Sequence, residues 1–232
     1  MILLDVLENF EVMYRLMIFL SLLLGIGFAV LRSKRKGVPG NIIGYTVMLS
    51  VVLLLSLSIG VTFITSAGEA IGLNGTGAAV GIGLGIFTMA MISPQYKRKL
   101  AGSFFMALPL MYGIGKIGCS FAGCCAGLPY HGAFSVSGRE GVEVFPIQAL
   151  EAAVFLLLFL GSAVLDIRGH FKPVIAAIVY ACAKIMLDFL RDTHVEHIFS
   201  QNQIMCLVIV IVLCTMHIIS AINNKDRLQV RQ

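Results

Sequence analysis

The chain has 232 residues, of which 58% are apolar and 12% are charged, and its mean hydropathy is +0.94. A soluble domain carries about 25% charged residues, so this composition excludes a disordered chain, a coiled coil and an ordinary soluble enzyme, and it favours a polytopic membrane protein. The net charge of +5 would suit a nucleic-acid partner, but we expect none, because the basic residues lie in loops on one side of the predicted membrane spans.

Seven segments are long and apolar enough to form transmembrane helices, which need about 20 residues to cross about 30 Å of hydrocarbon. In chain order they are residues 14–31, 42–65, 70–92, 100–115, 146–165, 173–190 and 203–222. The connections are short except around residues 113–145, where a glycine-rich stretch predicts an outer-face loop or re-entrant segment. We therefore expect an all-α integral membrane protein, with one domain over residues 1–232 that forms a bundle of seven helices.

Lys and Arg are concentrated in one set of loops, which the positive-inside rule places in the cytoplasm. This set carries twelve of them, whereas the opposite set carries three. The N-terminus is therefore expected outside and the C-terminus in the cytoplasm. The acidic residues Asp5, Glu8 and Glu11 agree with this orientation and argue against a cleaved signal peptide, which begins with a basic region. The twelve are Arg32, Lys34, Arg35, Lys36, Lys97, Arg98, Lys99, Arg168, Lys172, Lys225, Arg227 and Arg231, and the three are Lys116, Arg139 and Arg191.

The third predicted span is rich in glycine. Gly77, Gly81 and Gly85 recur at every fourth residue and share one helix face. Small residues on one face let helices approach closely in lipid, so this face is interpreted as a packing surface rather than a ligand site.

Four ionisable residues lie within or at the end of the fifth and sixth spans, where charge is costly and usually marks function. Lys184, Asp188 and Arg191 are spaced to share one helix face, and Glu151 reaches the same outer depth at about 1.5 Å per residue. Cations and carboxylates at this depth would suit a phospholipid headgroup, with the cations on the phosphate and a carboxylate as a base. The alternative is a structural ion pair between Lys184 and Asp188. Arg191 would then reach toward the interface, as we also expect of Arg15.

A cluster of cysteines follows the fourth span. Cys119, Cys124 and Cys125 could form a disulfide on the oxidising side, remain inert thiols, or supply a reactive thiolate whose pKa is lowered by Lys116. A fourth interpretation, a metal site, is the least favoured. Zinc ligands usually occur as two closely spaced pairs, which Cys-x4-Cys-Cys does not provide, and His131 is the one imidazole nearby.

Several motifs resemble those of bacterial prolipoprotein diacylglyceryl transferases. Residues 115–127, Gly-Lys-Ile-Gly-Cys-Ser-Phe-Ala-Gly-Cys-Cys-Ala-Gly, resemble that family's signature Gly-Arg-Ile-Gly-Asn-Phe-Ile-Asn-Gly-Glu-Leu-x-Gly. Residues 145–151, Phe-Pro-Ile-Gln-Ala-Leu-Glu, resemble its His-Pro-Ser-Gln-Leu-Tyr-Glu. Residues 184–191, Lys-Ile-Met-Leu-Asp-Phe-Leu-Arg, resemble its Arg-x-x-x-Glu-Phe-Phe-Arg, and Asn202-Gln203 resembles the Gly-Gln that opens its last helix. The family's topology also has seven spans and an outer N-terminus.

The resemblance implies a transferase that moves a diacylglyceryl group from phosphatidylglycerol to the cysteine thiol of a lipoprotein precursor and releases glycerol phosphate. It implies a multi-pass protein of the bacterial cytoplasmic membrane whose partners are the phospholipid, the precursor and the bilayer, and we expect neither a cofactor nor a metal. Lys116 stands at the signature arginine that contacts the headgroup, and Lys184 stands at a second essential arginine. The catalytic candidates are Lys116, Cys119, Cys124, Glu151, Lys184 and Asp188, and the substrate-binding candidates are Gly118, Cys125, Gly127, Gln148 and Arg191.

The chain also departs from the family pattern. Cys119 replaces the signature asparagine, Cys124 replaces the signature glutamate, and residues 73–77 read Leu-Asn-Gly-Thr-Gly where the family has His-Gly-Gly. The two lysines keep the positive charge of arginine but cannot bind phosphate through two parallel hydrogen bonds. These changes indicate a divergent, cysteine-containing branch. Two other functions stay open: a membrane thiol or redox enzyme that uses Cys119, Cys124 and Cys125, and a non-enzymatic lipid-binding or transport protein.

Overall fold

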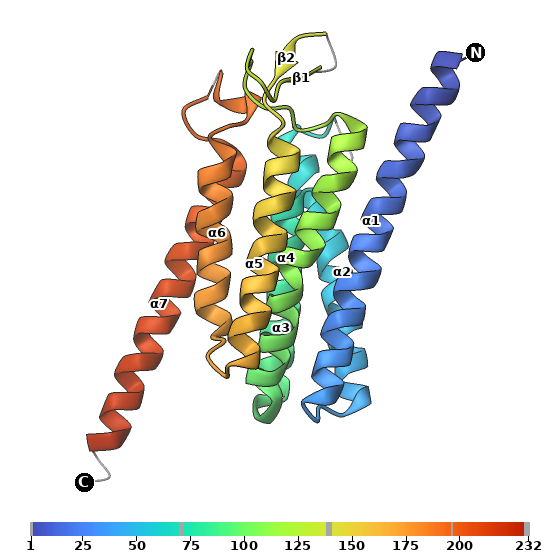
Figure 1. The fold of residues 1–232 in the computed structure, drawn as a ribbon. Helices are drawn as coiled ribbons and strands as arrows, with labels where there is room; N and C mark the ends of the chain where they lie inside the picture. Colours follow the sequence, from blue (N-terminus) through green and yellow to red (C-terminus); the bar gives the residue numbers. More distant parts are fainter. Residues whose placement is uncertain (1, 70–71, 138–140, 196, 230–232) are drawn as a thin grey trace.

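The computed structural model describes residues 2–69, 72–137, 141–195 and 197–229, which form a bundle of long α-helices (Figure 1). The chain runs up and down the bundle, so that its two ends lie at opposite ends of the molecule (Figure 1). Its elements are α1 (Ile2–Arg35), α2 (Gly40–Thr65), α3 (Gly75–Ile92), η1 (Pro94–Tyr96), α4 (Lys97–Ala122), β1 (Val136–Ser137), β2 (Glu143–Val144), α5 (Ile147–Ile167), α6 (Pro173–Asp188), η2 (Asp192–His194) and α7 (Gln201–Gln229).

Six of the helices in the described part of the chain are long and apolar enough to cross a membrane. The prediction of an α-helical membrane protein is therefore confirmed. The exception is α6, whose 16 residues extend about 24 Å at about 1.5 Å per residue. It ends at Asp188, two residues before the predicted end of the sixth span, because the chain turns there to bring Arg191 back toward Asp188.

Helix α4 lies in the middle of the bundle, and it is longer than the predicted span 100–115 (Figure 1). The prediction of irregular backbone from residue 113 was wrong, because residues 113–122 continue the helix and the irregular segment starts at Gly123. Glycine in a helix costs about 1 kcal/mol relative to alanine, but here it allows close packing. A Cβ on Gly113 would lie 2.9 Å from Leu156 of α5, and one on Gly118 would lie 2.8 Å from Met17 of α1. The helix then ends at Gly123 in the left-handed conformation, with φ of 59°.

The glycine face of α3 packs against α2, as the sequence predicts. A Cβ on Gly77 would lie 2.7 Å from the Leu57 carbonyl oxygen, and one on Gly85 would lie 2.6 Å from Ser50 Oγ. A Cβ on Gly81 would lie even closer to the backbone of α2, at Leu53. The helix begins at Gly75 rather than at residue 70, because Asn74 caps it by accepting a hydrogen bond from Gly77 N at 2.9 Å.

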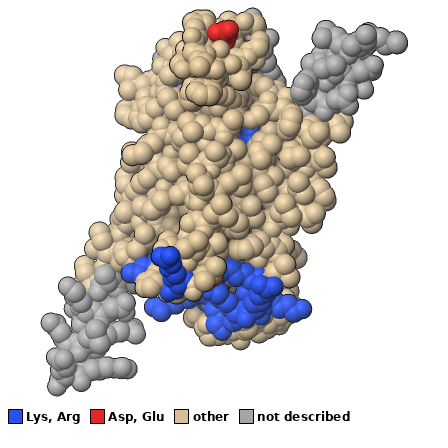
Figure 2. All heavy atoms as spheres, viewed as in Figure 1, with Lys and Arg blue, Asp and Glu red and all other residues tan. Residues whose placement is uncertain are grey.

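The two ends of the bundle differ in charge. Figure 2 shows Lys and Arg side chains gathered at the end where α1 leads into α2, α3 into α4 and α5 into α6. One basic residue at this end is buried: Arg32 of α1 binds Asp166 of α5 through Nε at 3.1 Å and Nη2 at 2.5 Å. The opposite end carries the short β1–β2 hairpin and the candidate functional site (Figure 1).

Candidate functional site

Glu151, in the first turns of α5, is fully buried and binds two lysines from neighbouring helices. Its Oε2 lies 2.7 Å from Nζ of Lys116 on α4, and its Oε1 lies 2.6 Å from Nζ of Lys184 on α6. The hydroxyl of Tyr112 donates a further hydrogen bond to Oε1 at 3.0 Å. A buried carboxylate is tolerated when it is paired and hydrogen-bonded in this way.

Asp188, at the end of α6, extends the network and is also fully buried. Its Oδ1 lies 2.7 Å from Lys184 Nζ and 3.1 Å from Arg191 Nη1, and its Oδ2 accepts a hydrogen bond from the Ser200 hydroxyl. Helices α4, α5 and α6 and the start of α7 thus meet at one ionic cluster. We name Lys116, Glu151, Lys184, Asp188 and Arg191 the ionic cluster; its three cations and two carboxylates leave one net positive charge.

The loop after α4 holds Arg191 in place. Gly127 pairs with Arg191 in an antiparallel bridge, flanked by backbone hydrogen bonds from Leu128 N to Leu190 O at 3.0 Å and from Asp192 N to Ala126 O at 3.2 Å. A Cβ at position 127 would collide with the carbonyl oxygen of Phe145. Gly127 therefore lets the loop lie against Phe145, just before the start of α5, and it affects the cluster through Arg191.

A capping box at the start of α7 holds Ser200 next to Asp188. Ser200 Oγ accepts a hydrogen bond from Gln203 N at 3.1 Å, and Gln203 Oε1 accepts one from Ser200 N at 3.0 Å. Gln203 Nε2 also donates to Ile185 O of α6 at 3.2 Å. Two residues of the site, Ser200 and Tyr112, were not predicted from the sequence. The Ser-x-x-Gln pattern before an apolar run could have identified Ser200, whereas a single tyrosine inside an apolar helix gives no such signal.

The ionic cluster lies at the edge of a cavity of about 780 Å³ between the helices. Lys116, Lys184 and Arg191 line this cavity, whereas the two carboxylates of the cluster are fully buried and are absent from its lining. The three cationic residues thus border the space, whereas the two carboxylate residues do not. The remaining walls are mostly apolar, and along α7 they run from Asn202 to Leu213, about 16 Å at about 1.5 Å per residue. This combination of a positively charged region and a long apolar wall matches the shape of a phospholipid.

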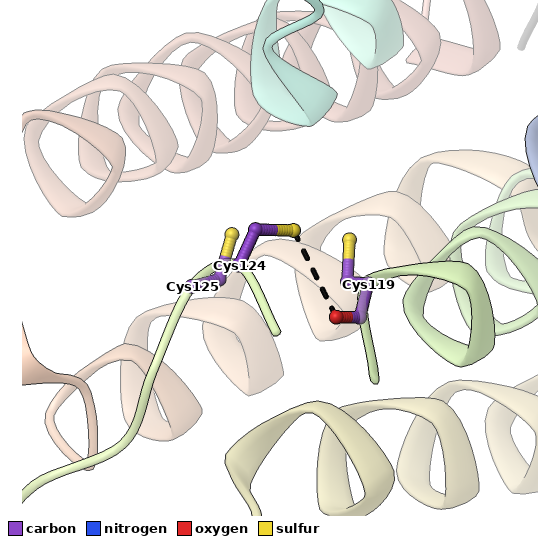
Figure 3. Close-up of side chains that lie close together, drawn as sticks. All are labelled: Cys119, Cys124 and Cys125. Atoms are coloured by element: carbon purple, nitrogen blue, oxygen red, sulfur yellow. Dashed lines mark hydrogen bonds between the residues drawn. The ribbon is translucent and has the colours of Figure 1, made fainter. Parts of the chain in front are cut away.

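The three cysteines also converge at the cluster side of the cavity. The sulfur atoms of Cys119, Cys124 and Cys125 lie within 4.8 Å of one another (Figure 3), and all three cysteines are free and half-buried. Hydrogen bonds from the Cys119 and Cys124 thiols, with the positive charges of Lys116 and Arg191, lower the pKa of the Cys125 thiol.

The other predicted site residues occupy supporting positions. Gln148 Nε2 donates to the Cys124 carbonyl oxygen at 2.8 Å and so anchors the cysteine loop to α5. Gly118 packs against Met17 of α1. Arg15 is exposed and pairs with Glu11 at 3.0 Å, outside the ionic cluster. Arg191 does not reach outward, as the alternative interpretation expected, but lies buried on Asp188.

A family model described as prolipoprotein diacylglyceryl transferase matches residues 2–219 of the chain. No curated protein matches the chain individually. The family match covers almost the whole sequence, including every helix that contributes to the ionic cluster and the cavity. The resemblance carried by the motifs is therefore confirmed, and the chain belongs to the prolipoprotein diacylglyceryl transferase family, whose members are membrane transferases of lipoprotein biosynthesis.

Proposed function

We propose that the protein transfers a diacylglyceryl group from phosphatidylglycerol to the cysteine thiol of a lipoprotein precursor and releases glycerol phosphate. The observation that carries the proposal is the orientation of the ionic cluster. Its three cationic residues line a large, mostly apolar cavity, while both carboxylates are fully buried and do not line it.

The cluster has the charge that an anionic headgroup requires. Its net charge of one positive unit matches the single negative charge of a phosphodiester. Arg191 keeps unused donors, because its buried Nε has no hydrogen-bond partner in the described part of the chain. A guanidinium edge and two ammonium groups facing one space can hold a phosphate through charge-assisted hydrogen bonds.

The same contacts would favour the transfer step. The acceptor thiolate attacks the terminal glyceryl carbon of the lipid, a carbon–sulfur bond forms, and the carbon–oxygen bond to the phosphate breaks. The phosphate oxygen leaves with the electron pair, and Lys116 and Lys184 stabilise the negative charge that develops on it. Glu151 contacts both lysines at 2.6–2.7 Å and fixes their positions relative to the phosphate.

The proposed topology places this reaction at the outer face of a bacterial cytoplasmic membrane. With seven spans, the N-terminus lies outside and the C-terminus inside, and the basic end of the bundle faces the cytoplasm. The exposed Lys and Arg residues at one end (Figure 2) support this orientation, as does the position of the ionic cluster at the start of α5 and the end of α6.

Complementation tests the proposal. In bacteria depleted of their own diacylglyceryl transferase, the chain should add the mass of one diacylglyceryl group to a reporter lipoprotein. Lys184→Met should slow the gain at least tenfold, whereas Lys172→Met, which removes an exposed lysine at the basic end, should leave its rate unchanged. An unmodified reporter in the presence of the folded wild-type chain would refute the proposed function.

A further inference from the structure

The cysteine cluster has no role in the phospholipid chemistry described above, yet a well-defined turn of the backbone brings its three residues together. Cys119 lies in the last turn of α4, and the chain reverses through Gly123 and Cys125, both left-handed with φ of 59°. For Cys125 this conformation is unfavourable, because a Cβ is disfavoured at positive φ. The turn brings three thiols together on one side of the loop (Figure 3), and the hydrogen bond from Gln148 to the Cys124 carbonyl oxygen holds it there.

The sulfur positions suit a metal ion. With zinc–sulfur bonds of about 2.3 Å, two sulfur atoms of a tetrahedral site lie about 3.8 Å apart. The three atoms here already lie within 4.8 Å of one another, so small side-chain rotations bring them to that separation. We propose that Cys119, Cys124 and Cys125 bind a thiophilic metal ion, with Zn²⁺ as the ion to be tested, and that its fourth coordination position is open.

The arrangement favours a metal over a disulfide. A disulfide joins two cysteines, whereas here three converge, and a bond between the adjacent Cys124 and Cys125 would be strained. Cys124 Sγ contacts the Cys119 carbonyl oxygen at 3.8 Å rather than pairing with the Cys119 sulfur. Thiolates are the ligands that Zn²⁺ and Cu⁺ prefer.

The fourth position faces the cavity. In the described part of the chain, no further Cys, His, Asp or Glu joins the cluster. Cys119 and Cys125 line the cavity, so an ion between the sulfurs would be reached from there. Three protein ligands and one open position are typical of reactive rather than structural zinc. Three thiolates with Zn²⁺ carry one net negative charge, and Lys116 and Arg191 are close enough to interact electrostatically with Cys125.

One consequence rests on the proposed function. The acceptor cysteine of the precursor must reach the same cavity, and it could occupy the open position on the ion. An ion held by Cys119, Cys124 and Cys125 would lower the pKa of the acceptor thiol, whose proton would pass to solvent, and the thiolate would form the carbon–sulfur bond as the phosphate leaves.

Metal analysis of the full-length protein tests the site. After purification in detergent under reducing conditions and incubation with Zn²⁺, the wild type should retain one zinc per chain against a competing chelator. Cys119→Ser, Cys124→Ser and Cys125→Ser should each lose at least tenfold in affinity. Cys182→Ser is the matched control, because Cys182 is a free cysteine of α6 outside the cluster, and it should bind as the wild type does. With Co²⁺ as the probe, thiolate-to-metal charge-transfer bands should appear in the wild type and the control and weaken in the other three.

Equal zinc binding by the wild type and the three cluster variants would overturn the metal site, as would a wild type that binds none. A disulfide between Cys119 and Cys124 in protein isolated without reductant, with no zinc present, would also overturn it. The two proposals fail separately: zinc binding without lipidation of the reporter contradicts the proposed function and leaves the metal site standing, whereas lipidation without zinc binding does the reverse.

Discussion

Removal of the Lys184 ammonium group tests how the ionic cluster is held together. Lys184 Nζ lies 2.6 Å from Glu151 Oε1 and 2.7 Å from Asp188 Oδ1. The substitution Lys184→Met keeps a long apolar side chain but leaves two buried carboxylates without their shared cation. Their oxygens lie at most 5.3 Å apart, the sum of these two contacts, so their repulsion amounts to about 3 kcal/mol at an effective dielectric constant of about 20.

The free energy of unfolding should fall accordingly. Loss of one partner from a buried ion pair typically costs about 3–5 kcal/mol, and we expect Lys184→Met to lie in that range when unfolding is followed in detergent. The rate of lipidation should fall as well, because a hydrogen bond to a charged group contributes about 1.5–3 kcal/mol, or about 10- to 150-fold in kcat/KM.

A double variant separates the two effects. Adding Glu151→Gln to Lys184→Met should cost less stability than the sum of the two single substitutions, because both remove the same contact between Lys184 and Glu151. Lipidation should stay low, because the cation that faces the phosphate is still absent. Lys184→Arg, which keeps the charge, should retain stability and part of the activity. A Lys184→Met protein that is as stable and as active as the wild type would refute this account of the cluster.

Three further changes separate the site from its surroundings. Asp166→Ala breaks the partly buried pair with Arg32 at the opposite end of the bundle. It should lower the free energy of unfolding by about 1–3 kcal/mol in denaturation experiments, while the folded protein keeps its kcat/KM; loss of activity in the folded variant would contradict the separation. Gly127→Ala should displace the Arg191 loop and reduce lipidation, whereas Gly161→Ala, where a Cβ meets open space, should not; equal activities would show that the loop contact is dispensable. Ser200→Ala removes a cap and a hydrogen bond to buried Asp188 and should cost about 1–2 kcal/mol in stability, and a variant that unfolds at the wild-type denaturant concentration would disprove the capping role.

The convergence of charges could be predicted from the sequence, because it follows from helix geometry. The spacing of Lys184, Asp188 and Arg191 and the equal depth of Glu151 are fixed by the rise and periodicity of an α-helix. The structure brings these four residues together with Lys116. The helix rise predicts the same depth for Arg15. Depth does not determine which way a side chain points, however, and the Arg15 side chain lies on the exposed surface.

The extent of α4 could not be predicted from the sequence alone. Gly113, Gly115 and Gly118 weaken an isolated helix, and their favourable contribution arises only when α1 and α5 pack against them. Similarly, the cysteine spacing does not by itself place three sulfur atoms together. That arrangement depends on the left-handed conformation of Cys125 and on the hydrogen bond from Gln148, neither of which leaves a sequence signal.

The central claim is that the cations of the ionic cluster bind the phosphate of an anionic phospholipid whose diacylglyceryl group is then transferred. Phosphorus NMR on the purified protein, mixed with phosphatidylglycerol and a peptide that carries the acceptor cysteine, measures this directly. Glycerol phosphate should be released by the wild type and by Lys172→Met only when the acceptor thiol is present, and Lys184→Met should release it at least tenfold more slowly. No glycerol phosphate from the wild type, or equal release from Lys184→Met, would contradict it.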